Sequence, residues 1–195
     1  TLFLFYEDRW TLLDVGDKSI TIGRKNKLER IRALVGTLAH DGDDSQKDHA
    51  VWKLWPLAEG EGLRQIVGAG GVAPLVALIT NGTDYQKIYA SYVLRELASA
   101  YHEEIIKAGG IAPLLDLVKD HWNKQNLKMY DALSVLSKLA GRNDMAKRKI
   151  IENDGVELLR KLTKDEIAWY PDPRAIRWLA GSLLEPTLRI HGPST

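Results

Sequence analysis

The sequence predicts an all-α solenoid, because two pairs of segments recur at nearly the same spacing. Residues 69–75 and 108–114 carry the heptapeptide Ala-Gly-Gly-Val/Ile-Ala-Pro-Leu, and the copies start 39 residues apart. Residues 42–47 and 82–87 share Gly, Asp, Gln and Lys at matching places, 40 residues apart. A fixed period near 40 is typical of stacked helical repeats, in which each repeat packs on its neighbours.

A nine-residue pattern supplies the third observation. It occurs at residues 50–58, 90–98 and 132–140, with Ala, Leu, Leu and Ala at its first, fifth, eighth and ninth places. Spacings of four and three residues put the first three of these on one face of a helix. We therefore expect these three helices to occupy equivalent places in successive repeats.

Residues 1–24 stand outside the repeats and are expected to form an N-terminal extension or cap, either irregular or a β-hairpin. Short runs rich in aromatic and β-branched residues occupy residues 1–6, 10–15 and 19–22. Gly-Asp-Lys at residues 16–18 is a candidate hairpin turn. Because terminal repeats of solenoids need a cover, this segment is expected to pack on the first repeat or on a partner.

Residues 25–186 are predicted to form the repeat domain, and residues 187–195 a C-terminal tail. The first repeat has two predicted helices, the first beginning near Asn26 and the second ending near Ala58. Each later repeat has a short helix and two longer ones. The predicted helices of the second to fourth repeats are 61–68, 72–80 and 84–99; 101–107, 111–119 and 124–140; 144–152, 156–164 and 173–184.

Local signals mark the boundaries of these helices. Asp43 or Asp44 is the expected N-cap before the first nine-residue pattern, with Gln46 placed as in a capping box, and Thr83 with Gln86 repeats the arrangement. The Gly pairs allow the turn before each middle helix. Proline follows in the first turn of that helix, where a missing N–H costs little.

Three-helix units of about 40 residues, the Gly-Gly-Val/Ile-Ala-Pro-Leu turn and the closing Ala-x-x-x-Leu-x-x-Leu-Ala helix resemble armadillo repeats. The resemblance covers about residues 25–186, or four units. It implies a right-handed superhelix whose third helices line a concave groove. The two-helix HEAT repeat is the near alternative, but it lacks the short first helix and the Gly turn.

Composition excludes several kinds of site. The 195 residues carry a net charge of +1 and no cysteine. Without cysteine there can be no disulfide, thiolate nucleophile or zinc–thiolate site. The balanced charge gives no reason to expect nucleic-acid binding. No apolar run approaches the roughly 20 residues that span a bilayer. We expect a soluble protein, cytoplasmic by default; a cleaved targeting peptide before Thr1 stays an open alternative.

The candidate catalytic motifs have structural explanations. Residues 68–73 match a dinucleotide fingerprint with Ala last, but no strand precedes them, so a turn between helices is favoured. Asn81-Gly82-Thr83 is a glycosylation sequon that is better explained as an Asn-Gly turn. The five histidines form no metal-ligand or nucleophile motif. We expect no catalytic residues, no metal, no cofactor and no enzymatic activity.

The third helices hold the candidate binding residues. In importin-type armadillo proteins the third and seventh places of the nine-residue pattern often carry Trp and Asn, and the Asn side chains hold the main chain of a peptide. Here the third places carry two aromatic residues and a serine, and none of the seventh places carries Asn. The resemblance therefore implies a groove that binds through side chains. The candidate partner-binding residues are Trp52, Trp55, Pro56, Tyr92, Arg95, Glu96, Ser134 and Lys138.

Two functional hypotheses follow. The first is a non-enzymatic protein–protein interaction module, or a structural subunit of a larger assembly, that binds a protein or peptide through the concave surface and the terminal segments. The alternative is the armadillo domain of an enzyme complex, such as a ubiquitin-ligase substrate adaptor. Trp52, Tyr92 and Glu96 are expected to form one stripe on the third helices of the first two repeats. A competing interpretation of Trp52 and Tyr92 is that they pack as core between repeats.

Overall fold

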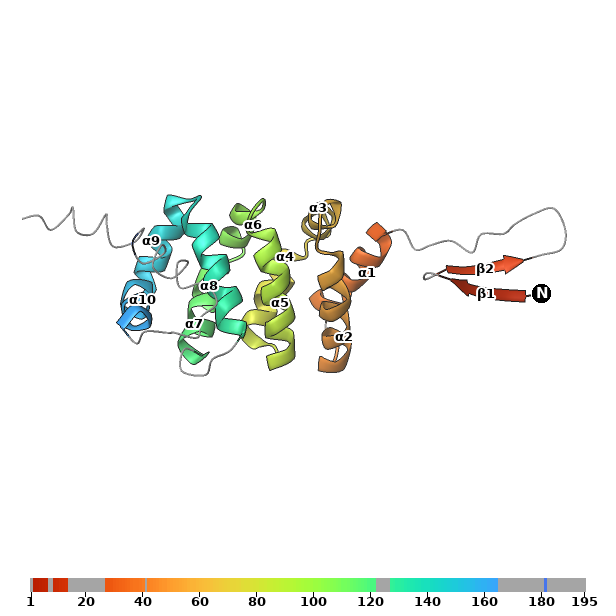
Figure 1. Cartoon of the computed structure of the whole chain (residues 1–195), viewed down its shortest axis with the longest axis horizontal. Coiled ribbons are helices and arrows are strands. Elements are labelled where there is room, and N and C mark those ends of the chain that lie inside the picture. Colours follow the sequence, from red (N-terminus) through yellow and green to blue (C-terminus); the bar gives the residue numbers. More distant parts are fainter. Residues whose placement is uncertain are drawn as a thin grey trace, which may run out of the picture.

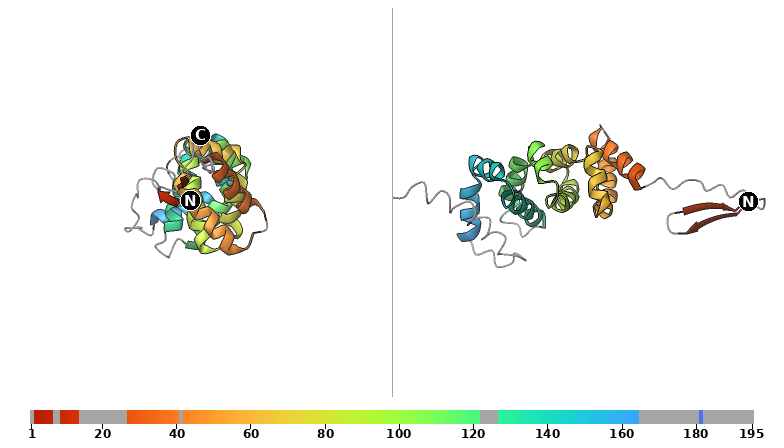
Figure 2. Two further views of the ribbon diagram at one scale, coloured as in Figure 1. Left: turned by 90° about the vertical axis from the view of Figure 1, so that its right-hand side faces the viewer. Right: turned by 90° about the horizontal axis from the view of Figure 1, so that it is seen from above.

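A computed structural model describes residues 2–6, 9–13, 27–40, 42–121, 127–164 and 181. Within these residues ten α-helices follow one another in an elongated array (Figures 1 and 2). They are α1 (Lys27–Ala39), α2 (Asp44–Leu54), α3 (Glu61–Gly68), α4 (Val72–Asn81), α5 (Asp84–Leu97), α6 (His102–Lys107), α7 (Ile111–His121), α8 (Leu127–Ala140), α9 (Asp144–Glu152) and α10 (Gly155–Lys164). A 3₁₀ turn, η1 (Trp55–Leu57), extends α2.

The helices fall into the predicted repeats. The first repeat has α1 and α2, the second α3 to α5, the third α6 to α8, and the fourth begins with α9 and α10. The third helices α2, α5 and α8 lie side by side in one row, and α2 packs on α5 as α5 packs on α8 (Figure 1). The helix predicted at 173–184 and the tail at 187–195 lie outside the described residues, apart from residue 181.

The N-terminal segment contains a hairpin. Strands β1 (Leu2–Tyr6) and β2 (Arg9–Leu13) pair antiparallel, with Leu2 opposite Leu13 and Tyr6 opposite Arg9. This pairing joins the first two of the three predicted runs. The turn predicted at 16–18 and the run at 19–22 lie outside the described residues, so the contact of this segment with the first repeat stays a prediction.

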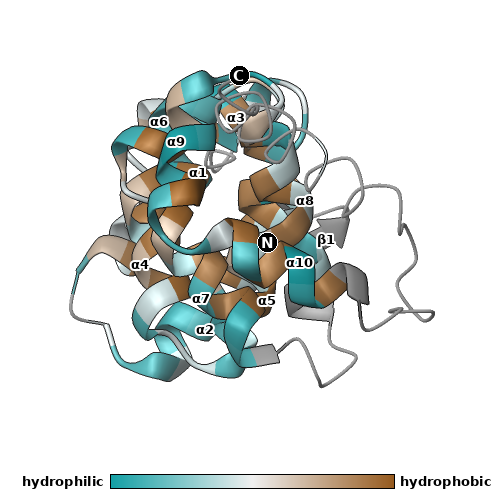
Figure 3. Ribbon diagram, turned by 90° about the vertical axis from the view of Figure 1, so that its left-hand side faces the viewer, coloured by the Kyte–Doolittle hydropathy of each residue, from teal (hydrophilic) through white to brown (hydrophobic). Residues whose placement is uncertain are grey.

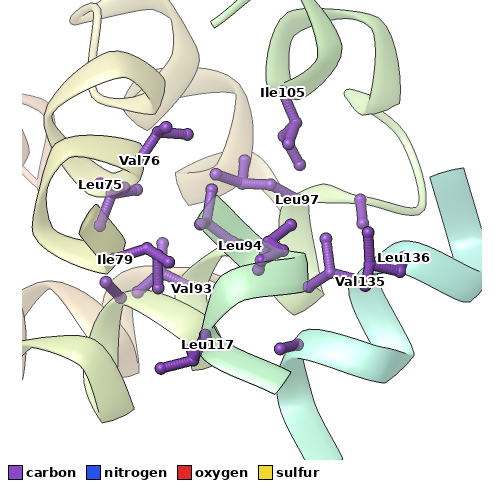
Figure 4. Close-up of a cluster of buried hydrophobic side chains, with 14 of the residues drawn as sticks. Leu75, Val76, Ile79, Val93, Leu94, Leu97, Ile105, Leu117, Val135 and Leu136 are labelled. Atoms are coloured by element: carbon purple, nitrogen blue, oxygen red, sulfur yellow. The ribbon is translucent and has the colours of Figure 1, made fainter. Parts of the chain in front are cut away.

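The core lies between the third helices and the helices behind them. Side chains from α4, α5, α6, α7 and α8 meet there, among them Leu75, Leu94, Ile105, Leu117 and Leu136 (Figure 4). In each copy of the nine-residue pattern the first, fifth and ninth residues are buried. The eighth residue, which the spacing places on the same face as the first and fifth, is buried in α5 and α8 and half-buried in the first copy, at Leu57. Viewed along the array, the apolar stretches of the helices line the inside (Figure 3).

The Gly-Gly turn has a distinct requirement at each glycine. Gly70 and Gly109 have φ of 76° and 75°, in the left-handed region that glycine favours. The second glycine packs closely on the preceding short helix: a Cβ on Gly71 would lie 2.8 Å from Cγ2 of Ile66. The fourth repeat keeps the turn with one exchange, since Asp154 takes the left-handed position with φ of 60°.

A buried hydrogen-bond network joins α2 and α5, the first two of the third helices. Thr83 caps α5 and forms the predicted capping box with Gln86. The Gln86 side chain is buried, and its Nε2 donates to Oδ1 of Asp48 at 2.8 Å and to the carbonyl of Asp44 at 3.2 Å, both on α2. Thr83 also donates to Asp48. The cap of one repeat is therefore tied to the helix of the previous repeat.

The two turns that resembled functional motifs are structural. Residues 68–73 run from the end of α3 through the Gly turn into α4, and Gly82 and Thr83 link α4 to α5. Among the described residues no single helix has the length and apolar composition needed to cross a bilayer, although α3 and α4, bent by 81°, meet both conditions when taken together.

Replacing Gly71 with Ala tests the close packing of the turn. The new methyl group would collide with Ile66, and overpacking of this kind costs about 1–3 kcal/mol. Gly68→Ala is the matched control, because nothing lies within 4 Å of a Cβ there and alanine favours a helix by about 0.5–1 kcal/mol. Denaturant unfolding should show opposite signs for the two variants; equal effects would contradict the packing account.

The network around Gln86 gives a second prediction. Gln86→Ala removes the buried bonds to α2 and should lower the free energy of unfolding by about 1–3 kcal/mol. Gln46 occupies the same place one repeat earlier but is exposed, so Gln46→Ala should cost much less. Thermal unfolding of both variants measures the difference. Similar losses would mean that the bonds between repeats contribute little.

Candidate functional site

An aromatic cluster lies on the row of third helices. Its five members are Trp52 from α2, Trp55 from the 3₁₀ turn η1, and Tyr85, Tyr89 and Tyr92 from α5. The three tyrosines are four and three residues apart, so they follow one face of α5. Trp52, Trp55 and Tyr85 each leave 41% of their surface exposed, whereas Tyr89 and Tyr92 are half-buried.

Trp55 joins the two helices of the cluster. Its ring centroid lies 5.7 Å from that of Tyr89 and 5.4 Å from that of Tyr92. Tyr89 in turn lies 5.8 Å from Tyr92, nearly perpendicular to it, and 4.6 Å from Tyr85. These separations are in the range of favourable ring contacts, so the rings hold one another in place.

The sequence around Trp55 explains its position. Helix α2 ends at Leu54, and Trp55 begins the 3₁₀ turn that contains Pro56. Proline lacks an N–H and cannot continue the α-helical bonding pattern. The Trp55 carbonyl therefore accepts from the N–H of Ala58 at 2.9 Å, three residues on. Pro56 itself is exposed beside the cluster.

Trp52 contacts a histidine and a lysine of its own helix, α2. Its ring lies 6.1 Å from that of His49, and the Nζ of Lys53 lies 4.6 Å from its centroid. The sequence placed Trp52 and Tyr92 in one stripe, but the residue that contacts Tyr92 is Trp55. The core interpretation does not describe Trp52, which is exposed, and Tyr92 is only half-buried.

A polar cluster adjoins the aromatic one and bridges α5 to α8. Arg95 donates to Oδ1 of Asp131 at 2.5 Å and to Glu96 at 3.1 and 3.2 Å. Lys138 donates from Nζ to the main-chain carbonyl of Arg95 at 2.8 Å. The Arg95 guanidinium also lies 5.4 Å from the centroid of Tyr92. Arg95 thus connects the aromatic cluster to the third repeat.

Burial changes the acidity of this polar cluster. Asp131 is 1% exposed, and its Oδ2 has no hydrogen-bond partner. Burial raises the pKa of Asp131 to about 6, against the opposing effect of Arg95. Burial also lowers the pKa of Lys138 and raises the pKa of Tyr92. The Tyr92 hydroxyl therefore stays protonated at neutral pH.

The structure brings together most of the residues singled out from the sequence. Trp55, Tyr92, Arg95, Glu96 and Lys138 lie in the two adjoining clusters. Trp52 also belongs to the aromatic cluster, Pro56 lies beside it in η1, and Ser134 is half-buried on α8.

Three residues of the clusters escaped the sequence analysis. Tyr85 and Tyr89 both precede the nine-residue pattern at residues 90–98, from which the candidates were taken. Their spacing from Tyr92 is the signal that could have found them. Asp131 just precedes the third copy, and an acidic residue there carries no signal of burial.

The described residues contain no group of three or more His, Asp and Glu side chains that could hold a metal ion. The chemistry that the two clusters offer is noncovalent: aromatic faces, indole N–H and phenol O–H donors, and charged groups that already pair with one another.

The pKa of Asp131 predicts how stability depends on pH. Because the folded pKa of about 6 exceeds the ordinary value of 3.8, the folded state binds more protons between these pH values. The contribution of Asp131 to the free energy of unfolding is therefore fully present below about pH 4. It falls by up to about 3 kcal/mol as the pH rises towards 6. Asp131→Asn should remove this loss and equal or exceed the wild type in stability at pH 7.

Unfolding of wild type and Asp131→Asn in urea from pH 3.5 to 7 measures the effect as a difference. Asp116→Asn is the control, because Asp116 is exposed and its pairing with Lys119 lies in solvent. The account predicts that the difference in free energy of unfolding between wild type and Asp131→Asn changes with pH. A difference that stays constant from pH 3.5 to 7 would contradict it.

Comparison with solved structures identifies the architecture. An engineered protein aligns over 80% of this chain and 62% of its own, with 25% identity and a TM-score of 0.67. A computationally designed armadillo repeat protein for modular peptide recognition aligns over 80% of this chain and 63% of its own, with 21% identity and a TM-score of 0.62. A designed armadillo repeat protein in complex with the peptide (KR)4 aligns over 85% and 75%, with 21% identity and a TM-score of 0.63.

This chain therefore spans less than two thirds of the length of the first two of these structures. No protein-family model and no curated protein matches the sequence. The repeats, the Gly turns and the row of third helices agree with the fold of these structures, and the chain is an armadillo-like repeat solenoid.

Proposed function

We propose that this chain is a non-enzymatic interaction module that binds an extended segment of a partner protein across its third helices. The observation that carries the proposal is the aromatic cluster, in which Trp55 bridges two successive third helices. Trp and Tyr are the residues most often found as binding hot spots, since they bury a large area at a low cost in entropy.

The exposure of the cluster favours a binding role over a structural one. Trp52, Trp55 and Tyr85 keep 41% of their surface in solvent, although the residues beneath them, such as Leu54 and Leu94, are fully buried. Full burial of these rings is not needed to close the core. Covering them with a partner would bury further apolar surface and so supply binding free energy.

The polar cluster favours recognition through side chains. Arg95 bonds to Glu96 and to buried Asp131, and Lys138 donates to the main-chain carbonyl of Arg95. These bonds pre-organise the Arg95, Glu96 and Lys138 side chains beside the aromatic rings. Pre-organised groups lose little freedom when a partner binds. The designed armadillo proteins of the same fold, made for peptide recognition or solved with a bound peptide, support a peptide ligand.

The same surface could serve in a more specific way, with the chain as a structural subunit of a larger assembly. In it, residues 1–24 supply a second contact or a cap for the first repeat. The aromatic cluster would then be covered by a neighbouring subunit in the assembled state.

Peptides selected against the wild-type chain from a displayed random 12-residue library test the binding surface. Trp55→Ala and Tyr92→Ala should each weaken the binding of a selected peptide by about 2 kcal/mol or more if these rings are hot spots. Met145→Ala is the matched control: Met145 is a large apolar side chain, 58% exposed on α9, away from the cluster.

Calorimetric affinity and melting temperature should be measured for each variant. Retained affinity in folded Trp55→Ala and Tyr92→Ala, or a selection that yields no peptide, would overturn the proposed function. A loss of affinity at an unchanged melting temperature would support it.

A further inference from the structure

We propose that the aromatic cluster binds proline-rich segments in the polyproline II conformation. This inference rests on the proposed function and names the class of ligand. Three features of the two clusters support it: the close spacing of the rings, the hydrogen-bonding groups beside them, and the internal neutralisation of the charged residues.

The ring spacing leaves no room for a ligand group between the rings. Trp55, Tyr89 and Tyr92 form a triangle with centroid separations of 5.4, 5.7 and 5.8 Å. The centre of this triangle lies only about 3 Å from each centroid, which is less than the 3.5–4.0 Å of a van der Waals contact. The rings therefore fill the space between them, and a ligand packs on their outer faces and edges.

Such a surface suits pyrrolidine rings. Neighbouring rings differ in tilt, from 33° between Trp55 and Tyr92 to 85° between Tyr89 and Tyr92, so the surface has ridges and notches. Proline-rich segments dock on surfaces of Trp and Tyr because their helix is already formed and little entropy is lost on binding. Exposed Tyr85 extends the surface along α5.

The hydrogen-bonding groups favour a ligand with few N–H groups. An ordinary extended peptide presents N–H donors and C=O acceptors, and both need partners when buried. An amide side chain, such as that of Asn, could accept from the peptide N–H and donate to the peptide C=O. The seventh places of the nine-residue pattern carry no amide; they carry Pro56, Glu96 and Lys138. Glu96 already accepts from Arg95, and Lys138 donates to the Arg95 carbonyl.

A proline-rich segment lacks most N–H groups and presents mainly carbonyls. The cluster can bond to these, because indole N–H and phenol O–H groups are donors. The Tyr92 hydroxyl is protonated at neutral pH, as an ordinary phenol is, and burial raises its pKa further. The groups needed by the ligand and those offered by the surface therefore correspond.

Charge favours the same ligand. In the polar cluster two basic side chains balance two acidic ones. Arg95 pairs with both Glu96 and Asp131, and Lys138 donates to the main-chain carbonyl of Arg95. A strongly basic or acidic peptide would gain attraction from one pair and repulsion from the other. An uncharged proline-rich segment matches a surface whose charges are already neutralised.

The test is selection from a displayed 12-residue library that encodes proline at one position in five, with sequencing of the input and selected pools. Proline should be enriched at least threefold among the selected sequences. A synthesised selected peptide should lose at least tenfold in affinity for Trp55→Ala and several-fold for Trp55→Phe, which keeps a ring but removes the N–H. Affinity for Met145→Ala should be unchanged.

The outcomes separate this inference from the proposed function. Selected peptides that depend on Trp55 and Tyr92 but show no enrichment of proline overturn the inference and leave the proposed function standing. Peptides that bind equally well to both variants, or an absence of binders, overturn the proposed function and the inference with it. If Trp55→Ala is unfolded by circular dichroism, Tyr92→Phe and Trp55→Phe decide through the loss of the donors.

Discussion

Burial between successive third helices is the interaction on which the rest of the structure depends. In α5, Ala90, Leu94 and Leu97 are fully buried, because α2 packs on one side and α8 on the other. Alanine at the first and ninth places allows the helices to approach, and leucine at the fifth and eighth fills the space behind. Each repeat can bury these residues only against its neighbours, so stability and the shape of the row arise together.

The same packing produces the candidate binding surface. One side of each third helix packs in the core. The residues on the outer sides of neighbouring third helices therefore lie next to one another. Trp55 from the first repeat thereby meets Tyr89 and Tyr92 from the second, and Arg95 meets Asp131 from the third. Gln86, which bonds to Asp48 on α2, helps to set the position of α5 relative to α2.

The sequence predicts the fold well because the repeat depends on local signals. The turns need a left-handed backbone at Gly70 and Gly109, which glycine adopts readily. Thr83 and Gln86 form a capping box, and the Ala/Leu pattern identifies the third helices. Even Asp154 fits, since aspartate tolerates the left-handed position better than most residues. Each of these signals is set by residues close together in the sequence, so it can be recognised without knowledge of distant contacts.

The site is predicted less completely because it depends on how one repeat faces the next. The sequence singles out Trp55 and Tyr92 but pairs Tyr92 with Trp52, and it overlooks Tyr85 and Tyr89. Whether Trp52 or Trp55 meets α5 is decided by the 3₁₀ turn at Pro56 and by the angle between the helices. The burial of Asp131 likewise follows from the packing of α8 on α5, which no local pattern specifies.

If a partner covers the aromatic cluster, the indole N–H signals of the chain report this contact directly. Six tryptophans give six resolvable signals in a nitrogen–proton correlation spectrum, each assignable by replacement with phenylalanine. On titration with a selected peptide, the signals of Trp52 and Trp55 should shift most and saturate together. Saturable binding that leaves both signals unmoved would contradict the claim.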